Sequence, residues 1–156
     1  MFVRNIKEFK KKTNKKKIIC LDCGKKRVGI AISNENHTLS LPMQVIKRDK
    51  EFNSKIANIL LDYNVGGILV GLPIDKSKKT NKISHFIIDI TKNLDFYLLD
   101  NNLDVPFFFW DESFTSIEAE DLTEGLYKNK KEQKKNLDKF AATIILDDFM
   151  NDEKKT

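Results

Sequence analysis

The sequence predicts an α/β domain with a central mixed five-stranded sheet flanked by helices. Three β-rich segments come first in the chain, and helical segments then alternate with two short apolar strands. Consecutive strands followed by alternating helices and strands favour a mixed sheet with helices on both faces. A length of 156 residues suits one such domain and is too short for two lobes of this kind.

The first three strands are predicted from short apolar runs. Residues 18–22 and 28–33 are two such runs, and the turn between them contains a glycine. Runs joined in this way are typical of a hairpin. A weaker third strand over 39–46 contains Pro42, which suits an edge strand or an irregular stretch. Apolar residues at helical spacing then predict a first helix over 52–63.

Two strands of the buried, parallel type follow in the second half of the chain. Residues 68–71 and 105–110 are continuously apolar, so both faces of each strand must be covered. Between them, the clearest amphipathic stripe in the sequence predicts a helix over 83–98. Thr115 and Glu118 have the spacing of a capping box, which predicts that a further helix begins there and runs to about residue 127.

Lysine clusters mark two segments that we expect to lie outside the regular elements. One is a linker over 128–135, which precedes a last helix with an apolar face from Leu137 to Phe149. The other is residues 1–17, whose net charge is +7, so the rest of the chain carries −2. We expect this arm to be flexible, and it could attract phosphates. The predicted organisation is an N-terminal arm at 1–17, a folded domain at 18–150 and a tail at 151–156.

Composition excludes several classes of protein. No stretch approaches the roughly 18 apolar residues that a membrane helix needs. The basic N-terminus has no apolar segment behind it, so a secretory signal is not expected. Cys20 and Cys23 both lie in a predicted buried strand, which indicates core residues in a reducing, cytoplasmic compartment rather than a disulfide framework or a zinc site.

Acidic residues stand at three places where a purely structural residue is unexpected. Asp22 ends a strand that should be central, Asp111 and Glu112 follow the most apolar strand, and Asp138 opens the last helix. Buried carboxylates cost several kcal/mol unless they are paired or bound to a cation. If the first strand and 105–110 are parallel neighbours, Asp22 and Asp111 meet at one edge of the sheet, where sites form in parallel sheets.

Such a cluster of carboxylates suits two hard cations. Mg²⁺ binds through one or two carboxylates together with waters and phosphate oxygens. Two ions about 3.5–4 Å apart can activate water and stabilise the leaving oxygen of a phosphodiester. Taken alone, the spacing is a weak signal that favours capping over metal binding, because acidic residues are common at strand ends and helix starts. Farther along the last helix, we expect Asp147 and Asp148 on a solvated face.

Four segments together resemble a known family. LDCGKKRVGIA at 21–31, VGLP at 70–73, DESFTSIEA at 111–119 and LDKFAATIIL at 137–146 resemble, in order, the four motifs of the YqgF family. These proteins are described as pre-16S rRNA nucleases and also as similar to Holliday junction resolvases. The matches cover nearly all of the chain from residue 18 to 150.

The resemblance implies an RNase H-like fold and metal-dependent cleavage of structured nucleic acid in the cytoplasm, with a role in trimming the 5′ end of pre-16S rRNA. By motif match, Asp22 and Asp138 are catalytic carboxylates that bind Mg²⁺ or Mn²⁺ at a two-ion site. The third acidic position falls on Asp111 or Glu112, and the motif does not distinguish them. Four-way DNA junctions are the alternative substrate, and the chain could act as a monomer or a homodimer.

One position departs from the family pattern. Ser113 stands where the family usually has arginine after its acidic pair. If that arginine contacts phosphate, its loss weakens the grip on substrate, and Lys25 or Arg27 on the first turn could compensate. A solvated turn explains these two cations equally well. Thr115 is a further candidate for substrate contact, although a helix cap is its simplest reading.

Two other classes of function remain at this point. The substitution at Ser113 and the basic arm motivate a catalytically silent RNA-binding module. An Asp-x-Gly turn after a first strand also occurs in actin-like and Hsp70-like ATPases. That architecture needs two related lobes, however, and this chain has the length of one.

Overall fold

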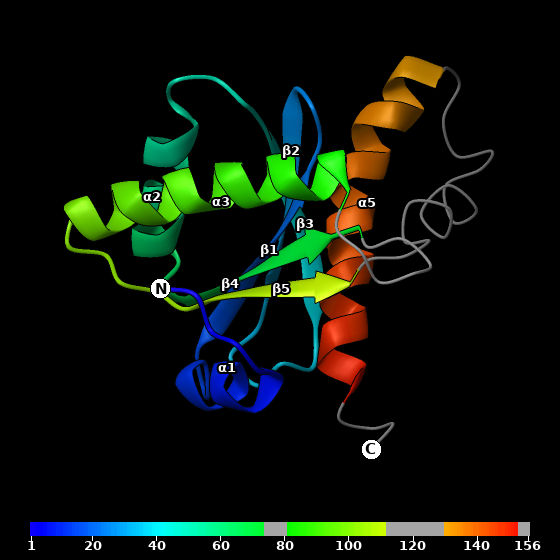
Figure 1. The fold of residues 1–156 in the computed structure, drawn as a ribbon. Coiled ribbons are helices and arrows are strands. Elements are labelled where there is room, and N and C mark those ends of the chain that lie inside the picture. Colours follow the sequence, from blue (N-terminus) through cyan, green and yellow to red (C-terminus); the bar gives the residue numbers. More distant parts are fainter. Residues whose placement is uncertain (74–80, 112–129, 153–156) are drawn as a thin grey trace.

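The computed structural model describes residues 1–73, 81–111 and 130–152, with only the backbone described over 130–139. These residues form a five-stranded sheet with helices on both faces, as the sequence predicts (Figure 1). In chain order, the elements are α1 (Ile6–Lys12), β1 (Lys17–Cys23), β2 (Arg27–Ser33), β3 (Ser40–Lys47), α2 (Phe52–Asp62), β4 (Val65–Leu72), α3 (Lys82–Asp100), β5 (Phe107–Asp111) and α5 (Lys130–Asn151).

The sheet is mixed and has the strand order β3-β2-β1-β4-β5. The two hairpin pairs, β1 with β2 and β2 with β3, are antiparallel, whereas β4 runs parallel to both β1 and β5. The register places Leu21 of β1 opposite Val70 of β4, and Val70 opposite Phe109 of β5. The central strands β1 and β4 therefore end at the same side of the molecule as β5.

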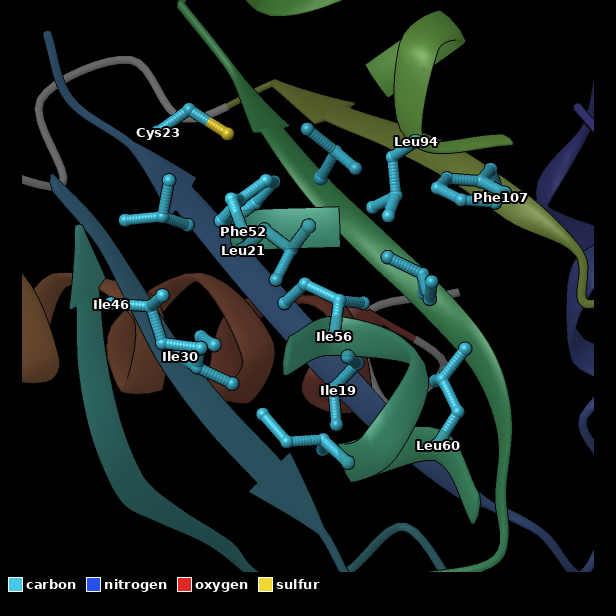
Figure 2. Packing of buried hydrophobic residues seen from close by; sticks show 14 of the residues in the cluster. Ile19, Leu21, Cys23, Ile30, Ile46, Phe52, Ile56, Leu60, Leu94 and Phe107 are labelled. Carbon is cyan, nitrogen blue, oxygen red and sulfur yellow. The ribbon is translucent and has the colours of Figure 1, made fainter. Parts of the chain in front are cut away.

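Each face of the sheet carries its own hydrophobic cluster. On one face, α2 and α3 cover alternate residues of the strands, and Figure 2 shows Ile19, Leu21 and Ile30 packed among Phe52 and Ile56 of α2. The opposite face belongs to α1 and α5, which cover the intervening residues. The buried residues of this second cluster are Val3, Phe9, Ile18, Cys20, Ala31, Leu69, Ala142, Ile145, Leu146 and Phe149. None of the described helices is long and apolar enough to span a membrane.

The N-terminal segment is folded, so the expectation of a flexible arm over 1–17 is wrong. The backbone nitrogen of Val3 donates to the carbonyl of Phe107 at 2.9 Å, which adds the first residues to the outer edge of β5. Phe9 of α1 is fully buried and stacks on Phe108. Close packing continues at Gly67, where any added Cβ would collide with the side chain of Thr13. The apolar residues between the lysines therefore hold this segment against the sheet.

The last helix also differs from its predicted boundaries. α5 begins at Lys130, so most of the expected lysine-rich linker over 128–135 is helical, and Asp138 lies inside the helix rather than at its start. Lysine has a high helix propensity and needs no buried partner, so the first turns form without an apolar face. The predicted helix from Thr115 to residue 127 lies outside the described residues.

The buried position of Phe9 makes a prediction about stability. Replacing Phe9 with alanine should lower the free energy of unfolding by about 3 kcal/mol, because the substitution removes the contacts of the ring with Phe108 and Phe149 and leaves a cavity. The matched control is Lys11→Ala, an exposed position on the same helix, which should change stability by less than about 0.5 kcal/mol. Urea denaturation measures both. Equal effects of the two substitutions would mean that α1 is not part of the folded core.

Candidate active site at the carboxyl edge of the sheet

The carboxyl ends of β1, β4 and β5 form one edge of the sheet, which we call the carboxyl edge. Asp22 follows Leu21 in β1, and Asp111 ends β5 opposite Leu72 of β4. The condition that β1 and β5 are neighbours is not met, because β4 lies between them. Two strand spacings therefore separate Asp22 from Asp111, about 10 Å between backbones. The structure brings the two residues to one edge without pairing their strands.

The two acidic residues belong to opposite faces of the sheet. Side chains alternate along a strand, and Ile18 and Cys20 of β1 pack in the cluster under α5. Asp22 continues that series and is half-buried. In β5, Trp110 packs in the cluster under α5, so Asp111 alternates toward the side of α2 and α3, where it is exposed. Alternation thus separates Asp111 from Asp22.

Helix α5 runs over the face that carries Asp22. Near its C-terminal end it contacts β3, where the hydroxyl of Ser40 donates a hydrogen bond to the carboxylate of Asp147. Ser40 lies at the level of Ile18, four residues before Asp22 and about 13 Å from it along the sheet. Asp138 precedes Asp147 by nine residues, also about 13 Å along the helix. The C-terminal part of α5 also reaches the end of β5, where the indole of Trp110 donates to Asp148 at 3.0 Å, and Asp138 lies nearer the N-terminal end of the helix.

Several predicted site residues cannot be placed. Glu112, Ser113 and Thr115 lie outside the described residues, and only the backbone of Asp138 is described. Among the side chains that the structure describes, no three acidic, histidine or cysteine residues gather into a group that could hold a metal ion. Of the four predicted ligands, the described side chains are thus those of Asp22 and Asp111.

A basic turn joins β1 to β2 at the carboxyl edge. It holds Lys25, which is exposed, and Arg27, which is half-buried. A glycine is required at position 24, because an added Cβ would lie 2.8 Å from the carbonyl oxygen of Arg27. The predicted cations of this turn therefore lie at the same edge as Asp22.

Arg48 supports this turn and was missed by the sequence reasoning. Its backbone nitrogen donates to the carbonyl of Lys26 at 2.8 Å, and its guanidinium donates to the carbonyl of Lys25. Nothing in the sequence marks Arg48, since it follows a weak edge strand and belongs to no motif. Because Arg27 pairs with Lys47, the next residue, Arg48, lies beside the turn.

The donors at this edge suit a hard cation. Asp22 offers carboxylate oxygens in a half-buried position, and Glu112 and Asp138 would add ligands of the same kind. Mg²⁺ and Mn²⁺ prefer such oxygen donors, whereas zinc and copper favour cysteine and histidine. Cys23 follows Asp22 directly but alternates to the other face, in the cluster under α2 and α3. Asp22 is therefore the described residue best placed to bind such an ion.

Comparison with known families decides the family of the chain. Residues 16–152 match a family model described as RuvX, Holliday junction resolvase. The chain belongs to the RuvX family. The match spans all strands of the sheet and leaves out residues 1–15 and 153–156. It begins just after α1, so the N-terminal segment that closes the outer edge of β5 precedes the RuvX match.

Curated relatives of this RuvX protein cover nearly its full length. A protein of Pelagibacter ubique is 32% identical over 152 residues, which are 94% of this chain and 97% of the relative. A protein of Orientia tsutsugamushi is 34% identical over 149 residues, 94% of this chain and 92% of the relative. Both carry the description "Putative pre-16S rRNA nuclease".

Solved structures show that this RuvX chain has an RNase H-like fold. RuvC of Thermus thermophilus, in complex with a Holliday junction substrate, superposes with a TM-score of 0.51 at 8% identity, over 88% of this chain and 96% of RuvC. The Holliday junction resolvase of fowlpox virus gives the same TM-score at 19% identity, over 86% and 98% of the two chains. The expectation of an RNase H-like fold is confirmed.

We expect the hydrogen bond between Ser40 and Asp147 to help to fix α5 on the sheet. Ser40→Ala should lower the free energy of unfolding by about 1–2 kcal/mol, because it removes the hydrogen-bond donor of a half-buried carboxylate. Gln44→Ala, an exposed position on the same strand, is the matched control and should have little effect. Chemical denaturation compares them. If Ser40→Ala is as stable as the control, the contact does not anchor the helix.

Proposed function

We propose that this protein is a divalent-metal-dependent nuclease that hydrolyses phosphodiester bonds of structured RNA in the cytoplasm, and that it matures the 5′ end of pre-16S rRNA. The observation that carries the proposal is the half-buried Asp22 at the carboxyl edge, beside a basic turn, in a chain of the RuvX family. The description of the relatives from Pelagibacter and Orientia supports the choice of substrate.

In this proposal, Asp22 and Asp138 hold the metal ions together with one residue of the pair that follows β5. Divalent cations held there would supply activation of water and stabilisation of the leaving oxygen of a phosphodiester. The residues of the chain supply the oxygen ligands and the position of the substrate. Lys25 and Arg27 lie where they can contact phosphates next to the scissile bond, in the role that the arginine missing at Ser113 would otherwise take.

Glu112, rather than Asp111, is the third ligand that we propose. Asp111 is exposed and alternates with Trp110, so it belongs to the face opposite Asp22. The adjacent acidic residue is the remaining candidate from the same motif. The alternation of β5 supports this choice between the two residues that the motif leaves open.

The Holliday junction remains a second candidate substrate, because the matching family model carries that description. The same carboxylates would serve either reaction. Cleavage of a pre-16S RNA and of a four-way DNA junction should be compared under identical conditions with Mg²⁺ and with Mn²⁺. Faster cleavage of the RNA supports the proposed role, and preferential resolution of the junction would replace it.

The central role of Asp22 is tested by a substitution that keeps its size. Asp22→Asn should lower the rate of RNA cleavage by on the order of 100-fold or more, because it removes a charged ligand without removing volume. Chelation of the metal should abolish cleavage by the unmodified protein. Asp62→Asn, an exposed residue at the end of α2 near the opposite edge, is the control. Equal activity of Asp22→Asn and the control would refute a catalytic role for Asp22.

If Glu112 is the ligand, substitutions of Glu112 and Asp111 should lower the cleavage rate by different amounts. Glu112→Gln should lower the cleavage rate by on the order of 100-fold, whereas Asp111→Asn should lower it by less than about tenfold. Steady-state cleavage of the same RNA by the two variants measures the difference. A larger loss for Asp111→Asn would show that alternation along β5 does not decide the ligand.

A further inference from the structure

A cavity of about 670 Å³ lies at the carboxyl edge, on the face opposite Asp22. Its walls come from the end of β1 with its turn, from the residue after β3 and from the start of α3. Figure 2 shows Cys23, one of its lining residues, at the end of the cluster that contains Leu21 and Phe52. The volume is within the range of about 300–1,000 Å³ that is usual for small-molecule sites. Cys23 directly follows Asp22 in β1, so the cavity and Asp22 share the end of one strand and lie on its two faces.

The lining combines apolar walls with positive charge. Ile83 and Phe86 of α3 contribute apolar surface, and Ile83 is 55% exposed. Lys25, Arg48 and Lys82 contribute the charge, and no carboxylate lines the cavity among the described residues. A ligand that fits this lining has a flat apolar part and an anionic part. A nucleotide within a nucleic-acid strand has both.

Arg48 is held in a fixed orientation inside this cavity. Its guanidinium carbon lies 4.3 Å from the centroid of the Phe86 ring. Hydrogen bonds to the carbonyl of Lys25 from its side chain, and to that of Lys26 from its backbone, fix it from the side of the turn. A guanidinium plane held in this way is a stacking surface for a nucleobase. The side chain of Arg48 is therefore already ordered in the free protein, and binding a base costs it little further conformational entropy.

The start of α3 is fixed at the same edge. The hydroxyl of Ser84 donates to the carbonyl of Pro73, directly after β4, and Asn81 caps the helix by accepting from the backbone nitrogen of Ser84 at 2.9 Å. Both contacts anchor the first turn of α3 beside the carboxyl end of β4 (Figure 1). The apolar wall of the cavity is therefore held at a set distance from the strand that carries Asp22.

We propose that this cavity binds an unpaired nucleobase of the strand whose phosphodiester is cleaved at Asp22. The base stacks on the guanidinium of Arg48, Ile83 covers its edge, and Lys25 and Lys82 contact the adjoining phosphates. The inference rests on the proposed nuclease function and specifies its substrate as RNA that is single-stranded next to the scissile bond. A base inside a continuous duplex is already stacked and paired, and taking it out costs a few kcal/mol.

The test measures binding to metal-free protein, so that no cleavage occurs. A single-stranded RNA oligonucleotide is compared with versions that lack one base at successive positions. Removal of the base at one position should weaken binding to the unmodified protein by about tenfold, the size expected for one stacking contact. A loss that is the same at every position, or no loss at all, would overturn the proposal.

A double comparison, of the missing base with the Arg48 substitution, tests whether the base binds in this cavity. Arg48→Ala should weaken binding of the intact oligonucleotide by about tenfold and should show no further loss with the abasic one. Lys50→Ala removes the same charge two residues away, at an exposed position that does not line the cavity, and should retain the abasic effect. If Arg48→Ala retains the abasic effect in full, the base binds elsewhere.

A second variant covers the possibility that Arg48→Ala does not fold. Ile83→Ser alters an exposed residue and should reduce the abasic effect while leaving the urea midpoint unchanged. An unaltered abasic effect in Ile83→Ser would count against the cavity. Cleavage assays on the same oligonucleotides separate the two proposals. Position-specific coupling without cleavage would refute the nuclease function alone, whereas cleavage without coupling would refute the cavity alone.

Discussion

The constraint on which the structure depends is that both faces of the sheet are buried. Helices α2 and α3 cover one face, and α1 and α5 cover the other. A charged side chain in either layer loses its hydration, at a cost of several kcal/mol unless it gains a partner, as Asp95 of α3 does with the amino group of Met1. The edge where the parallel strands end is the place at which a carboxylate can stay partly hydrated and still belong to a strand. Asp22, half-buried at the end of β1, occupies that position.

Parallel pairing also decides which residues meet at this edge. Because β4 pairs with β1 on one side and β5 on the other, all three strands finish together, and the basic turn after β1 finishes with them. The antiparallel strands add to the same edge from the other direction, since the end of β3 pairs with the start of β2. Arg48, which follows β3, thereby reaches the turn after β1. Acidic and basic groups from distant parts of the chain are gathered by strand order rather than by sequence proximity.

The sequence was sufficient for the five strands because each is a local apolar run bounded by a turn or a helix. It did not reveal that β4 lies between β1 and β5, since the order of strands in a sheet depends on crossover connections and not on the composition of any one strand. The start of α5 was placed too late for a related reason. Hydrophobic periodicity detects helices by their apolar residues, and the sequence of the first turns of α5 is lysine-rich and has no apolar residue before Leu137.

The N-terminal segment shows how a strong charge signal can conceal a weak packing signal. Eight cations dominate residues 1–17, but Val3, Ile6, Phe9 and Thr13 recur among them at helical spacing. Phe9 and Thr13 are fully buried, and Val3 is nearly so. The same spacing rule that located the other helices would have found this one. The lysines point to solvent while the apolar residues pack, so the net charge says nothing about order.

Residues that support the candidate site were harder to predict than residues that resemble a motif. Asp147 and Asp148 were expected on a solvated face. Asp148 is exposed and accepts a hydrogen bond from the indole of Trp110 at 3.0 Å, whereas Asp147 is half-buried and accepts one from Ser40. These contacts join α5 to β3 and to the end of β5. They connect residues far apart in the chain, so no local sequence pattern predicts them. They nevertheless fix the helix that carries Asp138 relative to the strands that carry the other acids.

The position of positive charge follows from the same physics. Ser113 leaves the acidic pair without the arginine that the family usually has, yet Lys25, Arg48 and Lys82 line a cavity at the carboxyl edge. They come from three separate elements, and each sits where its element meets solvent, so none requires a buried counter-charge. Phosphate contacts depend on charge density along a strand and not on one particular residue. A chain that lacks the usual arginine can therefore hold a polyanion by charges that its turns supply, provided that the sheet keeps those turns together at the edge that carries Asp22.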